Sequence, residues 1–460
     1  MDLPLSSAIA SILREDPLLA RSYLVGGCVR DALLGIPVND LDIEVYGVSY
    51  ETLVLGLSRY GRADLVGRSF GVVKLSHPSG ETWDFSLPRR DSKASLGHRG
   101  FDITLEPELS TLEASARRDY TINSMLWDPR RRELIDHHQG AKDLADRVLR
   151  HTGPAFIEDP LRVLRGMQFC GRFGLTATSE TLDLARSIVG TYSELPVERV
   201  REEWIKWATR SVKPSLGLRF LKECCWLETL PELATLVGVP QDPVWHPEGD
   251  VWVHTNHCVD ALVSNKEWQL SDVARRMVLM LAVLLHDSGK PSCTREEPRD
   301  GVLRIVSSGH ESAGGPLAGR FLERIGCPSG LRERIEPLVL NHGLYVEEPT
   351  ERLVRRLASR LEPSSIEDLS VVMTADASGR PPWSEGEPRR VGALRQVAAR
   401  LQVATEGPKQ LILGRHLLAR GVQPGRQMGA RLKEAFEAQL DGFFEDLEGA
   451  IRWLDKQDYS

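Results

Sequence analysis

Asp40 and Asp42, which are separated by a single residue, are the first residues in the chain whose types and spacing suggest chemistry. They lie in NDLDIEVYG, whose pattern predicts a strand, and side chains two residues apart on a strand point to the same face. Two carboxylates on one face can hold a hard cation such as Mg²⁺ against a triphosphate, and Asp84, in the predicted strand TWDFS, is a candidate third ligand. Isolated Asp-x-Asp pairs also occur in turns, so the neighbouring residues must decide between a metal site and a strand end.

A glycine pair lies just upstream, in YLVGGCVRDALLG, where a predicted strand runs directly into a predicted helix. Gly26 and Gly27 allow backbone N–H groups and the helix N-terminus to face an anion. Arg30 lies in the first turn of this helix, where a cation is unfavourable to the helix dipole, so a phosphate partner would explain its position. The ordered set of strand, glycine turn, helix and Asp-x-Asp strand predicts a site for a triphosphate and its metal ions.

A second set of polar residues lies at the predicted start of a helix, in IEDPLRVLRGMQFCGRF. Asp159 and Arg162 are three residues apart and share a helix face. The carboxylate can accept from the exocyclic amine of cytosine or adenine while Arg donates to the ring nitrogen beside it, whereas guanine and uracil present the opposite polarity. The alternative is a capping Asp with an ordinary ion pair. Arg165 continues the same basic stripe, and the other basic residues of this stretch, Arg147, Arg150 and Arg172, could follow an RNA backbone.

Histidines and aspartates gather in a later region, in VHTNH, LLHDSGK, SSGHES, LNHGLY and MTADASGR. A lone buried histidine is usually structural, but the adjacent His286 and Asp287 with several further histidines favour a metal site. Mixed imidazole and carboxylate ligands suit Mn²⁺, Ni²⁺, Fe²⁺ or Mg²⁺ better than a structural Zn²⁺, which favours thiolates.

The elements that must position these residues change in type along the chain. YLVGG, LDIEVYG, GVVKLS and TWDFSL predict strands, with the helix ETLVLGLSRYG between the second and third, and the pattern is helical from Asp159 onward. QDPVWHPEGDVW breaks the helical pattern near Pro240, and ASGRPPWSEGEPRR predicts a linker. We expect an α+β chain with a head over 1–150, a helical body over 151–240, a second helical unit over 241–380 and a helical tail over 381–460. The polar stretch SLPRRDSKASLGHRGFDI predicts a mobile loop in the head.

Composition limits the class of protein. The 58 basic and 65 acidic residues give a net charge of −7, which argues against a chain coated in basic nucleic-acid-binding surface. A hydrophobic fraction of 41% excludes wholesale disorder. Seven cysteines without a CxxC pair favour a reducing compartment. The N-terminus lacks a basic signal-peptide region, and the apolar run MVLMLAVLL is too short for a membrane span. We therefore expect a soluble cytoplasmic protein without a membrane partner.

Taken together, LVGGCVRDALLGIPVNDLDIEVYG, RRDYTINSM and IEDPLRVLRGMQFCGRFG resemble the head and neck of the class II tRNA nucleotidyltransferases (CCA-adding enzymes) and bacterial poly(A) polymerases. The resemblance implies a polymerase-β-like nucleotidyltransferase head with a mixed sheet, followed by an all-α neck. It implies that Asp40 and Asp42 hold two Mg²⁺ ions, which activate the RNA 3′-hydroxyl for attack on the nucleotide α-phosphate and stabilise the leaving pyrophosphate, with Asp84 as the third carboxylate.

The same resemblance assigns further roles in binding the nucleotide. Asp159 and Arg162 match the amino-acid template that selects C and A, and the predicted mobile loop matches a flexible loop associated with the switch to the final A. Relatives carry Arg where this chain has Gln168, which brings no charge to that contact. The residues implied to contact the nucleotide are Gly26, Gly27, Arg30, Arg118, Asp119, Asn123, Asp159, Arg162, Arg165 and Gln168.

The histidine-rich region resembles an all-α HD phosphohydrolase domain, and HPEGDVWVHT resembles the junction in multifunctional bacterial CCA-adding enzymes that carry one. The resemblance implies metal-assisted hydrolysis of 2′,3′-cyclic or terminal phosphates on RNA. The implied metal ligands are His254, His286, Asp287 and Asp376, with His310 and His342 as second-metal or phosphate contacts.

The leading hypothesis is template-independent addition of C, C and A to the tRNA 3′ end from CTP and ATP. It requires a grip on the acceptor arm only, so a local basic track along Arg147 to Arg172 suffices despite the net charge of −7. The alternatives are an enzyme that adds only A or only CC, a poly(A) polymerase, which the acidic tail FFEDLEGAIRWLDKQDYS disfavours, and an HD phosphohydrolase with an inactive RNA-binding head. A non-enzymatic RNA-binding module is disfavoured by the aromatic content of 6%. The oligomeric state stays open.

Overall fold

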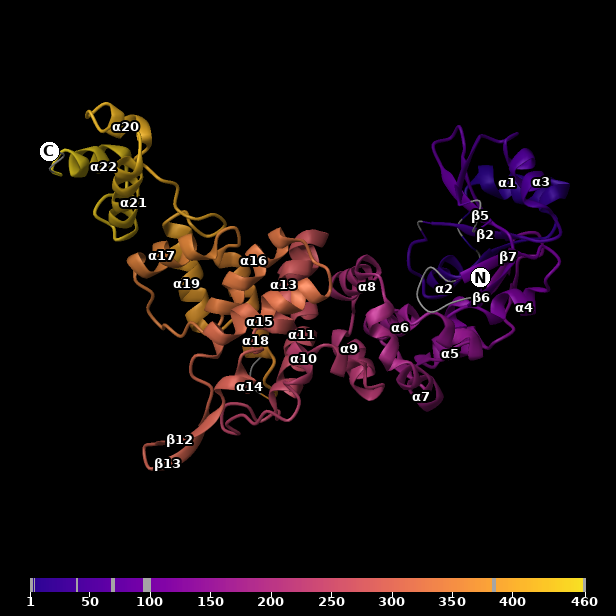
Figure 1. Cartoon of the computed structure of the whole chain (residues 1–460), viewed down its shortest axis with the longest axis horizontal. Helices are drawn as coiled ribbons and strands as arrows, with labels where there is room; N and C mark the ends of the chain where they lie inside the picture. The colour runs from indigo at the N-terminus through magenta and orange to yellow at the C-terminus, as the bar shows by residue number, and fades with distance from the viewer. Residues whose placement is uncertain are drawn as a thin grey trace. The chain divides into compact units, whose positions relative to one another are not determined.

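The computed structural model describes residues 3, 5–38, 40–67, 71–93, 101–382 and 386–457. The chain divides into two compact units, Met1–Thr229 and Leu230–Ser460 (Figure 1). The first unit begins with a sheet and continues with helices, and the described part of the second is helical apart from the hairpin of β12 (Arg295–Arg299) and β13 (Val302–Val306). This arrangement confirms the predicted α+β class.

A mixed seven-stranded sheet forms the centre of the first unit, in the order β3-β4-β5-β2-β1-β8-β9. Its strands are β1 (Ser22–Val25), β2 (Asp42–Val45), β3 (Arg62–Gly67), β4 (Val72–Ser76), β5 (Thr82–Ser86), β8 (Leu126–Asp128) and β9 (Glu133–Ile135). In β4 and β5 alternating side chains such as Val73, Leu75 and Phe85 are buried, which is the pattern of strands with one covered face, whereas Ile43, Glu44 and Val45 of β2 are all buried. The four strands predicted from the sequence, and the helix α3 (Tyr50–Leu57) between the second and third, are confirmed; β3, β8 and β9 were not predicted.

The pairing of β2 with β5 matters most for the site. These two strands run parallel, and their register places Asp42 directly beside Asp84. The other strand pairs of the sheet are antiparallel. Strands far apart in the chain thus bring two of the predicted carboxylates together.

The stretch predicted as a mobile loop is partly regular. Its flanks form a separate antiparallel hairpin of β6 (Arg89–Lys93) and β7 (Phe101–Leu105), with Arg89 opposite Leu105. Residues 94–100, the centre of the predicted loop, lie outside the described residues. The prediction of a loop was therefore wrong for the two flanks, which are strands.

Helices follow the sheet in the first unit. α6 (Leu161–Phe173) packs on α8 (Val197–Arg210) and α9 (Pro214–Glu223) around the buried Trp204 and Trp207. The hydroxyl of Tyr120 donates to the carbonyl of Arg162 over 2.8 Å, which ties the end of the sheet domain to α6. The remaining helices of the unit are α1 (Ser7–Glu15), α2 (Gly27–Leu33), α4 (Thr111–Ala116), α5 (Gly140–Ala145) and α7 (Ser179–Ser187).

The core of the second unit is the apolar helix α13 (Val273–Leu285), whose residues from Val278 to Leu285 are buried. It packs against α11 (Val251–Ser264), α15 (His310–Arg324), α16 (Ser329–Asn341) and α18 (Ile366–Ser378). A separate small cluster of apolar residues joins α20 (Gly414–Leu418), α21 (Arg426–Leu440) and α22 (Leu447–Leu454). The other helices are α10 (Pro231–Ala234), α12 (Lys266–Leu270), α14 (Lys290–Cys293), α17 (Glu351–Leu361) and α19 (Arg389–Arg400). None of the helices in the described residues is long and apolar enough to cross a membrane.

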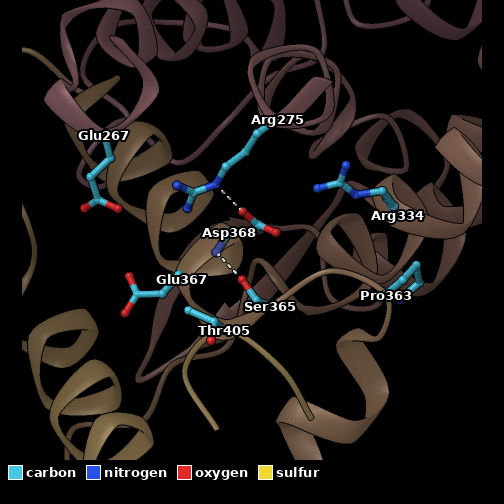
Figure 2. Close-up of a pocket in the computed structure, with 8 residues that line it drawn as sticks. All are labelled: Glu267, Arg275, Arg334, Pro363, Ser365, Glu367, Asp368 and Thr405. Carbon is cyan, nitrogen blue, oxygen red and sulfur yellow. Dashed lines mark hydrogen bonds and ion pairs between the residues drawn. The ribbon is translucent and has the colours of Figure 1, made fainter. Parts of the chain in front are cut away.

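A polar pocket of about 360 Å³ lies where α13 and α18 begin (Figure 2). Arg275 donates from Nε to Oδ1 of the buried Asp368 over 2.7 Å, and the Asp368 N–H donates to the capping hydroxyl of Ser365. The later parts of the same helices carry residues of the histidine-rich region: His286 follows α13, and Asp376 lies in the last turns of α18. The ion pair therefore fixes the starting points of two helices that position metal-ligand candidates.

Asp368→Ala is expected to lower the free energy of unfolding of the second unit by about 2 kcal/mol, because it leaves Arg275 without its buried partner. Urea denaturation followed by tryptophan fluorescence measures the change. The control is Glu406→Ala, which breaks the pair between Glu406 and Lys409, side chains that are 69% and 87% exposed; a change below about 0.5 kcal/mol is expected there. Equal effects of the two substitutions would show that the buried pair has no special role.

Candidate functional site

Three carboxylates lie near the neighbouring central strands β2 and β5. Asp40 lies two residues before Asp42, the first residue of β2, and Asp42 and Asp84 are register partners on the two strands. Partial removal of water raises the pKa of Asp42, as do the negative charges of Asp84 and Asp40, while Arg118 opposes these effects. The only ammonium that the described residues place at Asp84 is that of Lys74, 4.0 Å away. Several carboxylates with so few direct cationic partners form a donor set that suits Mg²⁺.

The glycine turn joins β1 to α2, and β1 pairs with β2 in the sheet. Gly26 has φ = +72°, a conformation that other residues rarely adopt, and its N–H donates to the carbonyl of Met125 over 3.3 Å. A Cβ at Gly26 would lie 2.9 Å from Nη1 of Arg118. The backbone conformation therefore favours glycine at position 26, where the Arg118 guanidinium also approaches closely. Gly27 is the first residue of α2, so β1 ends at Val25, before the two glycines that the sequence placed at the end of this strand.

Arg30 has an internal position that the sequence argument did not include. Its side chain is buried, donates from Nε to Asp31 over 2.8 Å and from Nη1 to the side chain of Asn123, and stacks 4.5 Å above the ring of Phe173. The guanidinium thus joins α2 to the 121–123 turn and to α6. A phosphate is not needed to explain the placement of Arg30 in this helix.

The segment from Arg118 to Asn123 is organised around the buried carboxylate of Asp119. Oδ1 accepts from Nδ2 of Asn123 over 3.1 Å and from the Tyr120 N–H over 2.8 Å, and Oδ2 accepts from Nε of Arg165 over 2.7 Å. Burial alone would raise the pKa of Asp119, but the charge of Arg165 and the Asn123 hydrogen bond lower it below its ordinary value. Asp119 is therefore an ionised bridge between this segment and α6, not a member of a surface ion pair.

Glu44 is a buried carboxylate that sequence reasoning missed. It accepts from the hydroxyl of Tyr46 over 2.7 Å, and its oxygens lie 3.3 Å from Nη2 of Arg117 and 3.6 Å from Nη2 of Arg118. Burial opposes its ionisation, but the two arginines outweigh burial and lower the pKa of Glu44. Glu44 follows Asp42 by two residues on β2, so extending the alternation that identified Asp40 and Asp42 would have found it.

Asp159 and Arg162 lie at the entrance to α6, where each bonds to other groups. Oδ1 of Asp159 accepts from the N–H of Leu161 over 3.1 Å, and Oδ2 lies 3.1 Å from Nη2 of Arg199. Arg162 donates to the carbonyls of Ala155 and Arg117 over 2.8 and 2.7 Å. The alternative interpretation is therefore met only in part: Asp159 lies before the N-cap residue Pro160 and accepts the N–H of the first helical residue, and its ion partner comes from α8.

Gln168 lies in the interior of the helical layer. It is 1% exposed, and among the described residues its Nε2 has no hydrogen-bond partner. Of the basic residues flanking α6, Arg147 donates to the carbonyl of Phe173, Arg150 lies 3.2 Å from Asp143, and Arg172 lies 3.4 Å from Asp31. The structure thus gives each of these arginines a partner within the first unit.

The second unit brings together the six residues predicted for its metal centre. Oδ2 of Asp287 lies 3.1 Å from Nε2 of His286 and 3.7 Å from Nε2 of His254, while Oδ1 of Asp376 lies 3.0 Å from His254 Nε2. Oδ1 of Asp287 lies 3.3 Å from Nε2 of His310 and 3.7 Å from Nε2 of His342. Asp287 therefore stands between two groups of ligand atoms, one toward each of its oxygens.

The donor atoms of this cluster fit a metal ion. Nε2 of His286 and Oδ2 of Asp287 are buried and, among the described residues, make no hydrogen bond of good geometry, although Nζ of Lys290 lies 2.8 Å from that carboxylate oxygen. Burial would raise the pKa of Asp287 and Asp376, but the cationic and hydrogen-bonding groups around them hold both well below the ordinary value. An imidazole lone pair and an ionised carboxylate facing each other are best satisfied by a cation between them.

Several supporting residues of the cluster were not predicted. Lys290 places Nζ 2.8 Å from Oδ2 of Asp287 and donates to Gln241, and Arg380 places Nη2 2.7 Å from Oδ1 of Asp376. Glu248 lies 2.8 Å from a ring nitrogen of His254. Burial would raise the pKa of Glu248, but hydrogen bonds from His246 and His254 lower it to about 2. The sequence signal for Glu248, Lys290 and Arg380 is their closeness to the ligands in HPEGDVWVHT, HDSGK and ADASGR.

Comparisons with known proteins match the head domain and most of the length of the chain. Residues 22–150 match the poly A polymerase head domain. The multifunctional CCA protein of Aromatoleum aromaticum is 35% identical over 378 residues, covering 79% of this chain and 86% of the relative. That of Vibrio cholerae serotype O1 (strain M66-2) is 35% identical over 398 residues, covering 84% and 93%.

Solved structures share the fold along the whole chain. The Bacillus stearothermophilus CCA-adding enzyme in complex with CTP matches with a TM-score of 0.65 at 19% identity and 98% coverage of both chains. The Thermotoga maritima CCA-adding enzyme complexed with tRNA matches with a TM-score of 0.56 at 19% identity and 99% coverage of both chains. At this identity the likeness establishes the fold.

Proposed function

Because this chain belongs to the multifunctional CCA protein family of tRNA nucleotidyltransferases, we propose that it adds C, C and A in turn to the tRNA 3′ end from CTP and ATP. The observation that supports this most strongly is the pairing of Asp42 with Asp84 beside the glycine turn, since it assembles the metal ligands and the anion-facing backbone at one edge of the sheet. We assign addition to the first unit and any hydrolysis to the second. The seven free cysteines fit the reducing cytoplasm, where tRNA matures.

Asp40, Asp42 and Asp84 are the residues that would hold Mg²⁺ in this proposal. The ions would supply charge stabilisation for the triphosphate and lower the pKa of the RNA 3′-hydroxyl. The protein presents three carboxylates on neighbouring strands, and Arg118 lies between Glu44 and the glycine turn, where it can meet a phosphate. Arg30 and Asp119 instead hold Asn123 and Arg165 in place.

Asp159 and Arg162 would select the base. Oδ2 of Asp159 lies next to Arg199, so it is oriented before a base arrives, and the guanidinium of Arg162 is fixed by two backbone carbonyls. Fixed acceptors and donors favour the bases that match them, because a mismatched base leaves buried polar groups unpaired.

The addition reaction is tested with three tRNA substrates, ending before CCA, after C or after CC, incubated with CTP and ATP separately and together. Growth by C, C and A followed by arrest is expected. Addition of A alone or of C alone would reassign the chain to a partial CCA enzyme. Long A tracts would indicate a poly(A) polymerase, and incorporation of all four nucleotides would contradict the proposal.

A second activity is supported by the convergence of six ligand candidates on Asp287. The arrangement would bind one metal ion among His254, His286, Asp287 and Asp376, and a second near His310 and His342. Ni²⁺, Mn²⁺, Fe²⁺ and Mg²⁺ are the candidate ions. Such a centre would supply activated water for hydrolysis of 2′,3′-cyclic or terminal phosphates at a damaged RNA end.

The double substitution His286→Ala, Asp287→Ala is expected to abolish hydrolysis of 2′,3′-cyclic AMP, because it removes the residue between the two ligand groups and one of its neighbours. Nucleotide addition by the same variant is the control, and it should stay within about twofold of the parent, since the addition site lies in the other unit. Unchanged hydrolysis would contradict the second activity. Loss of both activities would contradict the assignment of one activity to each unit.

A further inference from the structure

The four histidines of the second-unit cluster share one orientation. Each turns Nε2 toward Asp287 or Asp376 and holds Nδ1 on the outer side, where it meets an acceptor oxygen. For a histidine that binds a metal through Nε2, the group that accepts the hydrogen bond from Nδ1 matters, because it fixes both the tautomer and the ring orientation. The source of that acceptor differs among the four histidines.

Three of the histidines are held by their own chain. Nδ1 of His286 donates to the carbonyl of Val283 over 2.7 Å, Nδ1 of His310 to that of Ser307 over 2.8 Å, and Nδ1 of His342 to that of Val339 over 2.7 Å. Each acceptor lies three residues earlier, at a helix end or start. The local fold alone therefore orients these three rings.

His254 differs because it lies inside α11. The carbonyl four residues earlier, that of Asp250, accepts the backbone N–H of His254, and the carbonyl of Val251 accepts the hydroxyl of Thr255. The acceptor at Nδ1 is instead Oε1 of Glu248, 2.8 Å away. His254 is thus the one member of the four whose ring is oriented by a side chain.

We propose that Glu248 is the positioning residue of the second-unit metal centre: its carboxylate accepts the Nδ1–H of His254 and so turns Nε2 of that ring toward Asp376 and the metal position. This inference rests on the proposed metal-dependent hydrolase and names a residue outside its ligand set. A carboxylate can only accept, so the Glu248 contact fixes the proton of His254 on Nδ1 and leaves Nε2 as the ligand atom.

Glu248 is built for a fixed position. Its side chain is fully buried in the loop that precedes α11, and the same Oε1 is 2.8 Å from Nδ1 of His246. Gly249 donates to the carbonyl of His246 over 3.3 Å, and Asp250 caps α11 by accepting from Val253 over 2.8 Å. Hydrogen bonds on both sides of Glu248 therefore hold the loop, so the carboxylate has little freedom to move with the ring of His254.

Two substitutions of Glu248 test whether its acceptor oxygen orients the ring of His254. Glu248→Gln keeps an acceptor oxygen that can serve His254, whereas Glu248→Ala removes it and lets the ring rotate or change tautomer. Glu311→Ala is the matched control, because Glu311 lies 3.5 Å from Nδ1 of His310 while that N–H already has the carbonyl of Ser307. A carboxylate beside a ligand histidine is thus removed in both alanine variants, but only one of them orients its ring.

The test is a titration of the metal-stripped full-length chain with Mn²⁺ by calorimetry, in an Asp42→Asn background that weakens the first-unit site. We expect Glu248→Ala to weaken Mn²⁺ binding by about 10- to 100-fold, as for other lost partners of metal-bound histidines. Glu248→Gln and Glu311→Ala should remain within about threefold of the parent. The visible spectrum of the Co²⁺-loaded protein gives a second readout, which should change in Glu248→Ala and be restored in Glu248→Gln.

The outcomes separate this inference from the function on which it rests. A parent protein that binds neither Mn²⁺ nor Co²⁺ would contradict the metal centre itself. A parent that binds both, with the same affinity and the same Co²⁺ spectrum in Glu248→Ala, would overturn the role of Glu248 and leave the centre intact. Equal losses in Glu248→Gln and Glu248→Ala would also overturn it, because the acceptor oxygen would then not be the cause. An unchanged melting temperature in Glu248→Ala, together with unchanged nucleotide addition when Glu248→Ala is made alone with Asp42 intact, excludes misfolding as the source of a loss.

Discussion

Asp42→Asn should lower the rate of C addition to a tRNA lacking its CCA end by at least about 10³-fold, because metal ions held on the triphosphate would lower the activation barrier by several kcal/mol and the variant would lose that stabilisation. The substitution keeps the size of the side chain and removes the charge at the centre of the three carboxylates. Its amide would also lie beside Asp84 as a donor on the face where a cation must bind. Single-turnover addition at saturating CTP and Mg²⁺ measures the effect.

The control for this result is Asp64→Asn, on β3 of the same sheet. Asp64 is partly exposed and lies 2.7 Å from Arg62, so it shares the sheet but none of the site. It should change addition by less than about twofold. Two results would contradict the two-metal site at β2 and β5. One is an Asp42→Asn variant that retains more than about a tenth of the parent rate. The other is an addition rate that responds to higher Mg²⁺ in the same way in Asp42→Asn and Asp64→Asn.

The sequence predicted the individual strands well but not the contact that makes the site. The alternation of apolar residues in LDIEVYG and TWDFSL predicts β2 and β5, and it places Asp40 and Asp42 on one face. It cannot predict that β5 lies parallel to β2 with Asp84 opposite Asp42, because β3 and β4 intervene in the chain. Sheet order depends on packing of the whole head.

Buried partners account for most of the remaining surprises in the first unit. Arg30 was expected to need a phosphate, but Asp31, Asn123 and Phe173 provide its partners. Asn123 and Phe173 are distant in the chain, so nothing local could have signalled them. Glu44 is the opposite case. The sequence predicted its position on a strand but not its burial against Arg117 and Arg118.

The cluster of candidate metal ligands in the second unit could be picked out from the sequence, but the residues that support it could not. An adjacent His-Asp pair is an unusual pattern, so His286 and Asp287 stand out in the sequence. Glu248 and Lys290 are ordinary charged residues by type, and their importance comes from burial and from the atoms they face. Supporting residues of this kind become recognisable only when the side chains have coordinates.

Asp159→Asn is expected to reduce the preference for CTP and ATP over UTP and GTP by about 10²-fold, since it exchanges an acceptor for a donor at the position that meets the base edge. Oδ1 of Asp159 accepts from the Leu161 N–H, and the asparagine oxygen can keep that bond, so the start of α6 is preserved. The new amide replaces Oδ2, the oxygen now next to Arg199, and it can donate to the carbonyl oxygen of uracil or guanine. Single-nucleotide incorporation into a tRNA ending before CCA, with each of the four nucleotides alone, measures the preference.

A control variant separates recognition of the base by the Asp159 carboxylate from the contribution of its ion partner. Arg199→Ala removes the ion partner of Asp159 but leaves the carboxylate, so the preference for CTP and ATP should persist within about threefold even if the rate falls. If Arg199→Ala lost the preference as fully as Asp159→Asn, the ion pair and not the carboxylate would determine the choice of base. If neither variant changed the preference, selection would lie elsewhere, and the guanidinium of Arg162, fixed by the carbonyls of Ala155 and Arg117, would be the remaining candidate in this region.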